Sequence, residues 1–288
     1  MHNSIFDNCL LFRINIRAWN PKLTSKRASD EVTQSYGAEN GSARVIRTLL
    51  PKDASNKIAA MRNRILLEAH KFTLPYDDSP NRICTPKSYD HIMANYNKWE
   101  SDFNKVKDDI IFDYPMYRAD APNRLGGLYD PGEWPNKIDG YFSIHPVLQP
   151  LPKGDNIPNQ FGRERYQEIK ETTDKYVSDA LADAIRANWT NIQDSLHWFR
   201  DVLSDERDGE AKEKLNIRTD TMKRLQDQLD LYESLNFSND QRITDTIKVC
   251  RDELFKYNIE TIRGSKEVRE HIKLRTDDVL DAMHSIWA

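Results

Sequence analysis

The densest polar cluster in the sequence lies at a predicted turn, where two adjacent carboxylates stand beside an aromatic residue. Asp77 and Asp78 follow Tyr76 directly, and Arg82 comes shortly after them. Paired carboxylates can hold a divalent cation or share a proton. A metal site normally needs a third and a fourth ligand at loop or helical spacing, and the sequence offers none. It therefore favours the other interpretation, a structural turn in which Asp77 caps backbone amides and Arg82 pairs with a carboxylate.

A second cluster is basic and surrounds one tryptophan near the N-terminus. A strand with cations on its outer face and an aromatic ring beside them can hold a single nucleic-acid strand by phosphate contacts and base stacking. The alternative is a solvated surface of uneven charge, since no recognisable nucleic-acid-binding module accompanies the cluster. The candidate nucleic-acid-binding residues are Arg13, Arg17, Trp19, Lys22, Lys26 and Arg27.

Motifs of catalysis and metal binding are absent from the sequence. No two of the seven histidines have metal-binding spacing on one helix face. There is no phosphate-binding loop, no H-E-x-x-H and no nucleophile elbow. Cys9, Cys84 and Cys250 form no C-x-x-C pair, which indicates reduced thiols rather than a disulfide or zinc scaffold. We therefore expect a protein that is not an enzyme, with no catalytic residue, no metal and no other cofactor.

The composition is typical of elongated helices with wide solvated faces. Of the 288 residues, 38% are hydrophobic and 31% are charged. The net charge of −4 conceals a basic N-terminal part and an acidic remainder, which is the asymmetry behind the nucleic-acid hypothesis. No apolar run approaches the roughly 18 residues of a membrane span, and the start lacks the pattern of a signal peptide. The sequence thus predicts a cytoplasmic protein without a membrane partner.

The strongest periodic pattern predicts a central helix over residues 88–114. Its apolar residues recur at alternating spacings of three and four, as in the seam of a coiled coil. Pro115 is expected to end this helix, because proline removes a hydrogen bond and clashes with the preceding turn. The predicted seam consists of Tyr89, Ile92, Tyr96, Trp99, Phe103, Val106 and Ile110.

Shorter elements are expected before and after this central helix. Residues 9–19 alternate as a half-buried strand with a basic outer face, and pieces of residues 141–148 are expected to pair with it. A short helix is expected near Asp30–Tyr36. A longer one, which Ser55 caps, is expected to run to about Lys71.

The C-terminal part predicts a bundle of about four helices. They cover residues 162–203, then 215–235, and two segments that begin after Ser238 and Ser265. The first would be about 60 Å long, so part of its apolar stripe is expected to contact another protomer or protein. The predicted fold is thus mainly α, a long-helix bundle over residues 161–288 with a small α+β cap over residues 1–160.

Four short phrases occur in a characteristic order along most of the chain. They are TLPYDDSPNRI (Thr73–Ile83), LGGLYDPGEWP (Leu125–Pro135), FSIHPVLQPLP (Phe142–Pro152) and LNFSND (Leu235–Asp240). Together they resemble a family of uncharacterised tailed-phage and prophage proteins. The chain departs from that pattern at Tyr76, where tryptophan is expected, and at Pro80, where glycine is expected. The resemblance implies no activity, but it does imply a gene neighbourhood with a MoxR-type ATPase and a von Willebrand A-like protein.

Two functions remain open from the sequence. The first is a phage-type helical protein that acts as an assembly or adaptor component in the host-cell cytoplasm. It would work through a protein partner or a homo-oligomer, and the family resemblance implies the MoxR-type ATPase as one such partner. The alternative is an accessory protein that binds single-stranded nucleic acid with its basic N-terminal face.

Overall fold

The fold is mainly α, as the sequence predicts. The computed structural model describes residues 8–156, 162–204, 206–207, 210–211 and 217–287, and these contain eight α-helices and three small sheets. The chain forms two compact units, neither of which is continuous in sequence. The first unit comprises residues 1–13, 71–91 and 148–288, and the second comprises residues 14–70 and 92–147. These units differ from the predicted sequential division at residue 160, because the chain passes between them within helices and strands.

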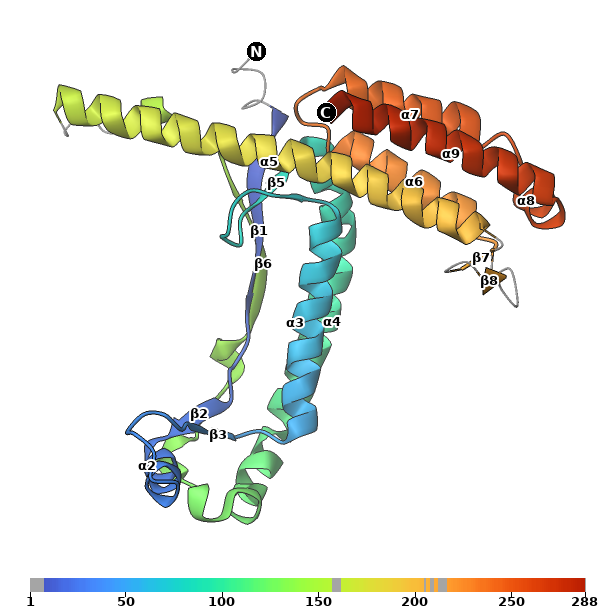
Figure 1. The fold of residues 1–288 in the computed structure, drawn as a ribbon. Helices are drawn as coiled ribbons and strands as arrows, with labels where there is room; N and C mark the ends of the chain where they lie inside the picture. The colour runs from blue at the N-terminus through green and yellow to red at the C-terminus, as the bar shows by residue number, and fades with distance from the viewer. Residues whose placement is uncertain (1–7, 157–161, 205, 208–209, 212–216, 288) are drawn as a thin grey trace. The chain divides into compact units, whose positions relative to one another are not determined.

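The C-terminal part of the first unit is the predicted helical bundle (Figure 1). The predicted first helix is present as Arg163–Leu203, and a one-and-a-half-turn helix, α8, is added between the last two predicted helices. The predicted start of the second helix near residue 215 lies outside the described residues. The elements are α5 (Arg163–Leu203), β7 (Glu206–Arg207), β8 (Glu210–Ala211), α6 (Thr221–Ser234), α7 (Gln241–Leu254), α8 (Ile259–Gly264) and α9 (Lys266–Trp287).

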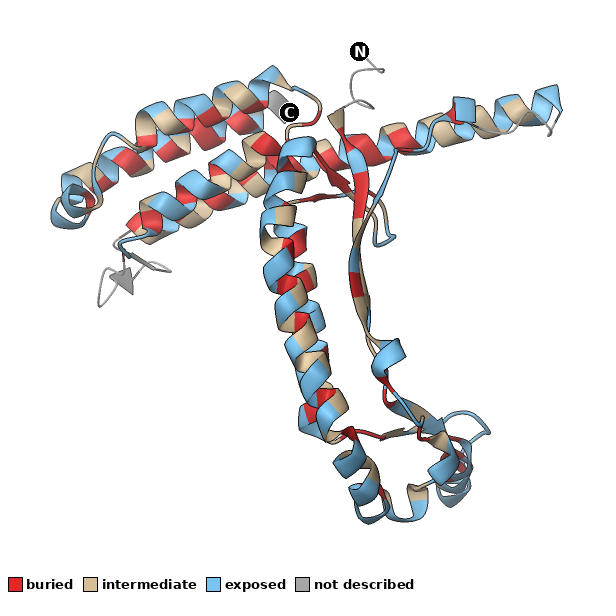
Figure 2. Ribbon diagram, turned by 180° about the vertical axis from the view of Figure 1, so that it is seen from behind, coloured by how far each residue is buried: buried red, intermediate tan, exposed pale blue. Residues whose placement is uncertain are grey.

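Aliphatic and aromatic residues at helical spacing form the core of this bundle. In Figure 2 the buried positions of α5 lie in its middle and C-terminal part, whereas its N-terminal turns are mostly exposed. No residue of α5 before Val177 is buried. The core includes Ile192, Leu196, Phe199 and Leu203 from α5, Leu225 and Leu229 from α6, Ile243, Ile247 and Cys250 from α7, and Ile272, Leu280 and Met283 from α9.

The N-terminal strand pairs within a four-stranded sheet. The strand order of the four-stranded sheet is β4-β5-β1-β6, which confirms the predicted pairing of the N-terminal strand with the segment near residue 145. Leu11 of β1 lies opposite Ile83 of β5 in an antiparallel register, and both side chains are buried. The strands are β1 (Leu10–Arg17), β4 (Leu74–Pro75), β5 (Arg82–Cys84) and β6 (Ser143–Gln149).

A short 3₁₀ turn, η4 (Gly154–Asn156), packs directly onto α5. The Gly154 N–H donates a hydrogen bond of 3.0 Å to Asp174 Oδ1, and Lys170 pairs with Asp155. A Cβ atom at position 154 would lie only 2.6 Å from Lys170 Cγ and 2.9 Å from the Lys170 carbonyl oxygen. Glycine is therefore needed for the close approach of the two backbones.

The second unit is built on the predicted central seam. Ile92, Tyr96, Trp99, Phe103 and Ile110 are all buried, which confirms the core of the seam. The unit's elements are β2 (Lys22–Ser25), α2 (Lys26–Ser35), β3 (Val45–Thr48), α3 (Lys52–Lys71), α4 (Pro86–Leu125), η1 (Gly126–Leu128), η2 (Pro131–Glu133) and η3 (Asp139–Tyr141), of which α3 and α4 extend into the first unit.

Polar contacts fix α3 against α4 beside this seam. Trp99 Nε1 donates to Glu68 Oε2 at 2.5 Å, and Arg64 pairs with Asp102 at 2.7 Å. Because the indole N–H of a buried tryptophan needs a partner, Glu68 satisfies Trp99 at the edge of the core.

Two expectations about helix ends are wrong. The central helix does not end at Pro115: α4 continues to Leu125 and contains both Pro115 and Pro122. Both prolines are exposed, while Tyr114 and Ala121 next to them are buried in the core, so tertiary packing outweighs the loss of two backbone hydrogen bonds. The expected cap Ser55 lies inside α3, which begins three residues earlier. The antiparallel pair β2–β3 was not expected either.

Candidate interaction surfaces

The Asp77–Arg82 segment is a hydrogen-bonded turn. Asp77 Oδ1 accepts a hydrogen bond of 2.8 Å from the Ser79 backbone N–H and another from the Ser79 hydroxyl, which is the amide capping that the sequence predicts. Asp77 Oδ2 accepts a hydrogen bond of 2.7 Å from the Tyr176 hydroxyl on α5. Partial burial acts to raise the pKa of Asp77, but the hydrogen bonds from Ser79 and Tyr176 outweigh it and hold the pKa below its ordinary value. Asp77 thus fastens this turn to α5.

The other polar residues of the turn do not complete a charged site. The expected pairing of Arg82 with a carboxylate is not found among the described residues. Arg82 instead donates from Nε to Thr73 Oγ1 at 2.7 Å and from Nη2 to the Thr73 carbonyl at 3.0 Å. Asp78 is exposed. Tyr76 is buried against the edge of Tyr176, and burial raises the pKa of Tyr76 to about 12. These contacts are those of a structural turn.

Three of the four phrases that carry the family resemblance meet in one apolar cluster. Tyr76 and Ile83 come from the first phrase, Leu151 from the third and Phe237 from the fourth. They pack together with buried residues of α5, among them Leu181. In addition, the Thr85 hydroxyl donates to the Ser234 carbonyl at 2.8 Å, which joins the segments next to two of the phrases. The phrases therefore have a packing role in the first unit.

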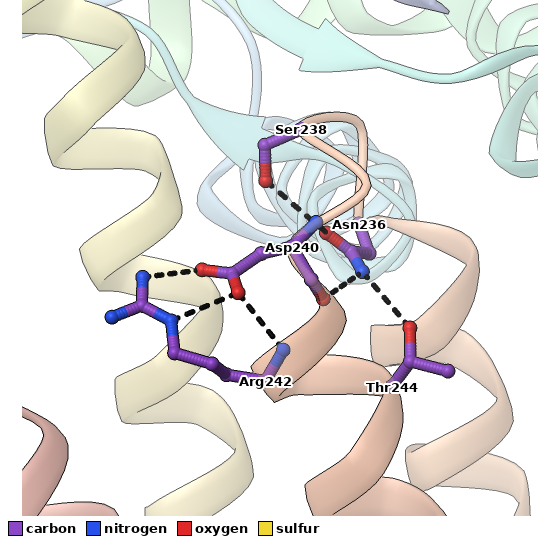
Figure 3. Close-up of polar contacts among 5 residues, drawn as sticks. All are labelled: Asn236, Ser238, Asp240, Arg242 and Thr244. Carbon is purple, nitrogen blue, oxygen red and sulfur yellow. Dashed lines mark hydrogen bonds and ion pairs between the residues drawn. The ribbon is translucent and has the colours of Figure 1, made fainter.

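The fourth phrase also builds a polar cap at the start of α7 (Figure 3). Asn236 Nδ2 donates to the Asp240 carbonyl at 2.9 Å, and Asn236 Oδ1 accepts from the Asp240 backbone N–H at 3.0 Å. Asp240 caps the helix by accepting from the Arg242 backbone N–H, and it also pairs with the Arg242 guanidinium at 2.6 Å. Asn239 completes the turn with a positive φ of 52°, which asparagine tolerates better than most residues. The network fixes the direction in which α7 leaves the loop.

The basic N-terminal residues are dispersed over different environments. Arg13 is half-buried and belongs to the first unit, whereas the other five candidates belong to the second unit. Arg17, Lys22, Lys26 and Arg27 are exposed, and the Arg17 guanidinium lies 5.9 Å from the centre of the Tyr141 ring. Only part of the predicted basic surface is therefore open to a phosphate backbone.

Trp19 is not an open stacking platform. Its side chain is only 9% exposed and packs against Tyr114, edge to face, with ring centres 5.6 Å apart. The Tyr141 ring lies 6.5 Å from it at a tilt of 34°. A base would have to displace this aromatic cluster to stack on Trp19, and the residue is better described as a core anchor of the second unit.

Two arginines of the basic segment bind backbone carbonyls, Arg47 from a mostly buried side chain and Arg27 from one that is 71% exposed. Arg27 donates to the Gly127 carbonyl at 2.5 Å, and Arg47 donates to the Leu128 carbonyl and pairs with Glu133. Both acceptor segments belong to the second phrase of the family resemblance, Leu125–Pro135. The arginines hold an otherwise irregular loop, a role that the sequence did not reveal.

The most unusual exposed side chains belong to one face of α4 in the second unit. Phe112 is 86% exposed and Met116, one turn later, is 60% exposed. Large apolar side chains that stand together in solvent on a folded protein are a feature of interaction sites. Phe112 lies off the three-and-four spacing of the seam, which is a sequence signal of its exposure, and Met116 lies beyond Pro115, where the helix was expected to end.

Carboxylates surround this apolar pair. We define the α4 stripe as the exposed residues of α4 from residue 108 to residue 123. All of α4 is described, and within the stripe there are three carboxylates and no cation. The half-buried Lys107 lies 3.5 Å from Asp108 and neutralises part of this charge. The stripe is made up of Asp108, Asp109, Phe112, Pro115, Met116, Ala119, Asp120, Pro122 and Asn123.

The described part of the chain contains neither a candidate metal site nor a helix suited to a bilayer. No group of three or more histidine, cysteine, aspartate or glutamate residues there could hold a metal ion. None of the helices there is long and apolar enough to span a bilayer. Cys9, Cys84 and Cys250 are buried.

Comparisons with protein-family models, with curated proteins and with solved structures found no match. The resemblance to tailed-phage and prophage proteins therefore stays a prediction from the four phrases.

Proposed function

We propose that the protein is a non-enzymatic, phage-type assembly or adaptor component of the host-cell cytoplasm, and that the α4 stripe contacts its partner. The observation that carries this proposal is the exposure of Phe112 and Met116 on one face of α4. Burying two such side chains against a partner stabilises a complex by about 1.5–3 kcal/mol each. The α4 stripe therefore has the apolar anchor that a protein–protein interface needs near its centre.

The charges around the anchor indicate the chemistry of the partner. Asp108, Asp109 and Asp120 would repel an acidic surface and attract a basic one. An amphipathic helix with an apolar face and flanking lysines or arginines fits both features of the stripe, since such helices dock by anchors at spacings of three and four. By family association, a basic helix of the MoxR-type ATPase is the first natural partner to consider.

A pair of synthetic peptides tests this proposal. One carries leucines on one helical face and lysines on the other, and the second has glutamates in place of the lysines. We expect fluorescence anisotropy to show that the basic peptide binds the wild-type protein. Its affinity for the Phe112→Ser/Met116→Ser variant should be at least tenfold lower. Leu274→Ser, a change of a similarly exposed residue on α9, serves as the matched control and should bind like the wild type. Equal binding of both peptides, or no effect of the double substitution, would contradict the proposal.

The alternative function, binding of single-stranded nucleic acid, is supported by the exposed cations Arg17, Lys22 and Lys26 of the second unit. If they contact phosphates, affinity for an oligonucleotide should fall steeply with salt, because each contact releases a counterion. Neutralising all three should remove that binding and leave the basic peptide bound as before. Salt-sensitive oligonucleotide binding that is lost only in this variant would favour the alternative over our proposal.

A further inference from the structure

A groove of about 340 Å³ runs along the outer surface of the first unit between α7 and α9. Its floor is largely apolar: Val249 is 46% exposed and lies beside the buried Val279, with Ala282 on the same helix face. Its rims carry charged side chains from both helices. The groove is independent of the α4 stripe, since it belongs to other helices and to the other unit.

The two helices line this groove with the same pattern. On α7 the lining begins Arg242, Asp245, Thr246, Val249, and on α9 it reads Arg275, Asp278, Val279, Ala282. Each series therefore places an arginine, an aspartate, a β-branched residue and a small aliphatic residue at the same relative positions, on one helix face.

The helices also run in opposite directions. α7 leads into α8 at one end of the pair, and α9 returns alongside it, as Figure 1 shows. Glu253, at the end of the α7 lining, lies 3.7 Å from Arg275, at the start of the α9 lining. Two patterns that match by residue class, with only the arginine and the aspartate identical, give the groove an approximate local two-fold symmetry on antiparallel helices.

The charges on the rims are mixed and largely paired. Arg275 lies 3.1 Å from Asp278 and also contacts Glu253, while Arg242 pairs with Asp240. The lining holds two arginines and three carboxylates, so its net charge is small. A surface of one sign would favour a nucleic acid or a strongly charged protein. Mixed charges around an apolar floor instead complement a surface of the same kind.

We propose that this groove binds the same groove of a second copy of the chain. In such an isologous contact the pair α7–α9 of one copy packs on the same pair of the other, as in a four-helix arrangement. With the two-fold axis across the groove, Arg242 faces Glu253 of the second copy. With the two-fold axis along the groove, Arg275 of one copy faces Glu253 of the second copy. Either geometry places Val249 near the centre of the apolar contact and sets an arginine against a carboxylate.

The size of the groove indicates a transient dimer. Nine residues line it, whereas a stable interface uses about 20–30 residues on each side. We therefore expect a monomer–dimer equilibrium in the micromolar range and not an obligate dimer. A reversible contact of this kind would allow self-association to respond to the local concentration of the protein.

Sedimentation velocity of the full chain from about 1 to about 100 µM tests the proposal, because micromolar dimers form across this range. The wild type should shift from monomer to dimer. Val249→Lys puts a charge in the middle of the floor at an already half-exposed position, and it should weaken the dimer at least tenfold. Leu67→Lys on α3, where the native side chain is 65% exposed, is the matched control and should dimerise like the wild type.

Two results would overturn the proposal. One is a wild type that stays monomeric over the whole range, and the other is a dimer of unchanged affinity in Val249→Lys. Thermal unfolding followed by circular dichroism checks that the variant is folded. The α4 double substitution Phe112→Ser/Met116→Ser should leave dimerisation unchanged, so this proposal and the proposed function can fail separately.

Discussion

Helices α5, α6, α7 and α9 are held together by apolar side chains, whereas the loop at residues 126–133 of the second unit is held by arginines. In the bundle, Phe199 and Ile247 are fully buried among other apolar residues. In the loop, Arg27 and Arg47 reach the carbonyls of Gly127 and Leu128. Periodic apolar contacts thus fix the long helices, whereas an irregular segment with few apolar residues is positioned by side-chain donors that bind its backbone carbonyls.

The largest loss of stability is expected when a large side chain is truncated in an apolar core. Phe199→Ala should lower the free energy of unfolding by about 3–5 kcal/mol, because a large buried side chain leaves a cavity. Trp99→Ala, in the seam of the second unit, should cost a similar amount. Urea unfolding followed by circular dichroism measures both. Leu274→Ala, at an exposed position of α9, is the control and should change stability by less than about 0.5 kcal/mol.

A medium effect is expected where an arginine holds backbone carbonyls. Arg124 donates to the Thr48 carbonyl at 3.1 Å and to the Leu49 carbonyl. Arg124→Met should lower the free energy of unfolding by about 1–3 kcal/mol, since it leaves two partly buried acceptors unpaired. Arg124→Lys should retain only part of the stabilisation that arginine provides, because an ammonium group lacks the two-pronged geometry of guanidinium. A methionine variant that unfolded like the wild type would show that the contacts of Arg124 with these carbonyls do not stabilise the fold.

The smallest effect is expected at the Asp77 turn, which is polar like the loop but largely open to water. The lowered pKa of Asp77 means that its contribution to stability is present above its ordinary pKa and is lost as pH falls through the folded pKa. Because the carboxylate is mostly exposed, Asp77→Asn should lower the free energy of unfolding by only about 0.2–1 kcal/mol at pH 7. Below about pH 4 the variant's free energy of unfolding should depend less on pH than that of the wild type.

The same variant tests whether the turn holds a metal. Elemental analysis of the purified protein should find no stoichiometric metal either before or after Asp77→Asn. Bound metal in the wild type that disappears in the variant would show that the turn is a binding site and not only a structural one.

Structural features that depend on local periodicity were predicted well from the sequence. Ile192, Leu196 and Phe199 mark one face of α5, and the seam around Trp99 is equally regular, so both helices could be read from spacing alone. The continuation of α4 past Pro115 could not be predicted from spacing. It depends on the burial of Tyr114 and on contacts with residues far away in sequence.

The candidate sites were harder to predict for the same reason. Trp19 and Arg27 look like nucleic-acid contacts in a basic segment, yet their partners, Tyr114 and Gly127, are about a hundred positions further on. The exposure of Phe112 shows in the sequence only as a position outside the three-and-four spacing of the seam. Local patterns state which residues can form a site, but only tertiary contacts show which of them are already occupied.

The discontinuity of the first unit has a consequence for its biosynthesis. Cys9 and Leu11 share a cluster with Leu235 and Phe237, so the start of the chain leaves the ribosome long before its packing partners exist. At about 5–20 residues per second, roughly 230 positions of synthesis correspond to about 11–46 s of waiting. The second unit, whose residues end at 147, has all of its chain available much earlier. Ribosome-bound nascent chains should therefore show protease protection of residues 14–147 while the strand at Leu10 is still accessible, and a chaperone that shields apolar strands would act in this interval.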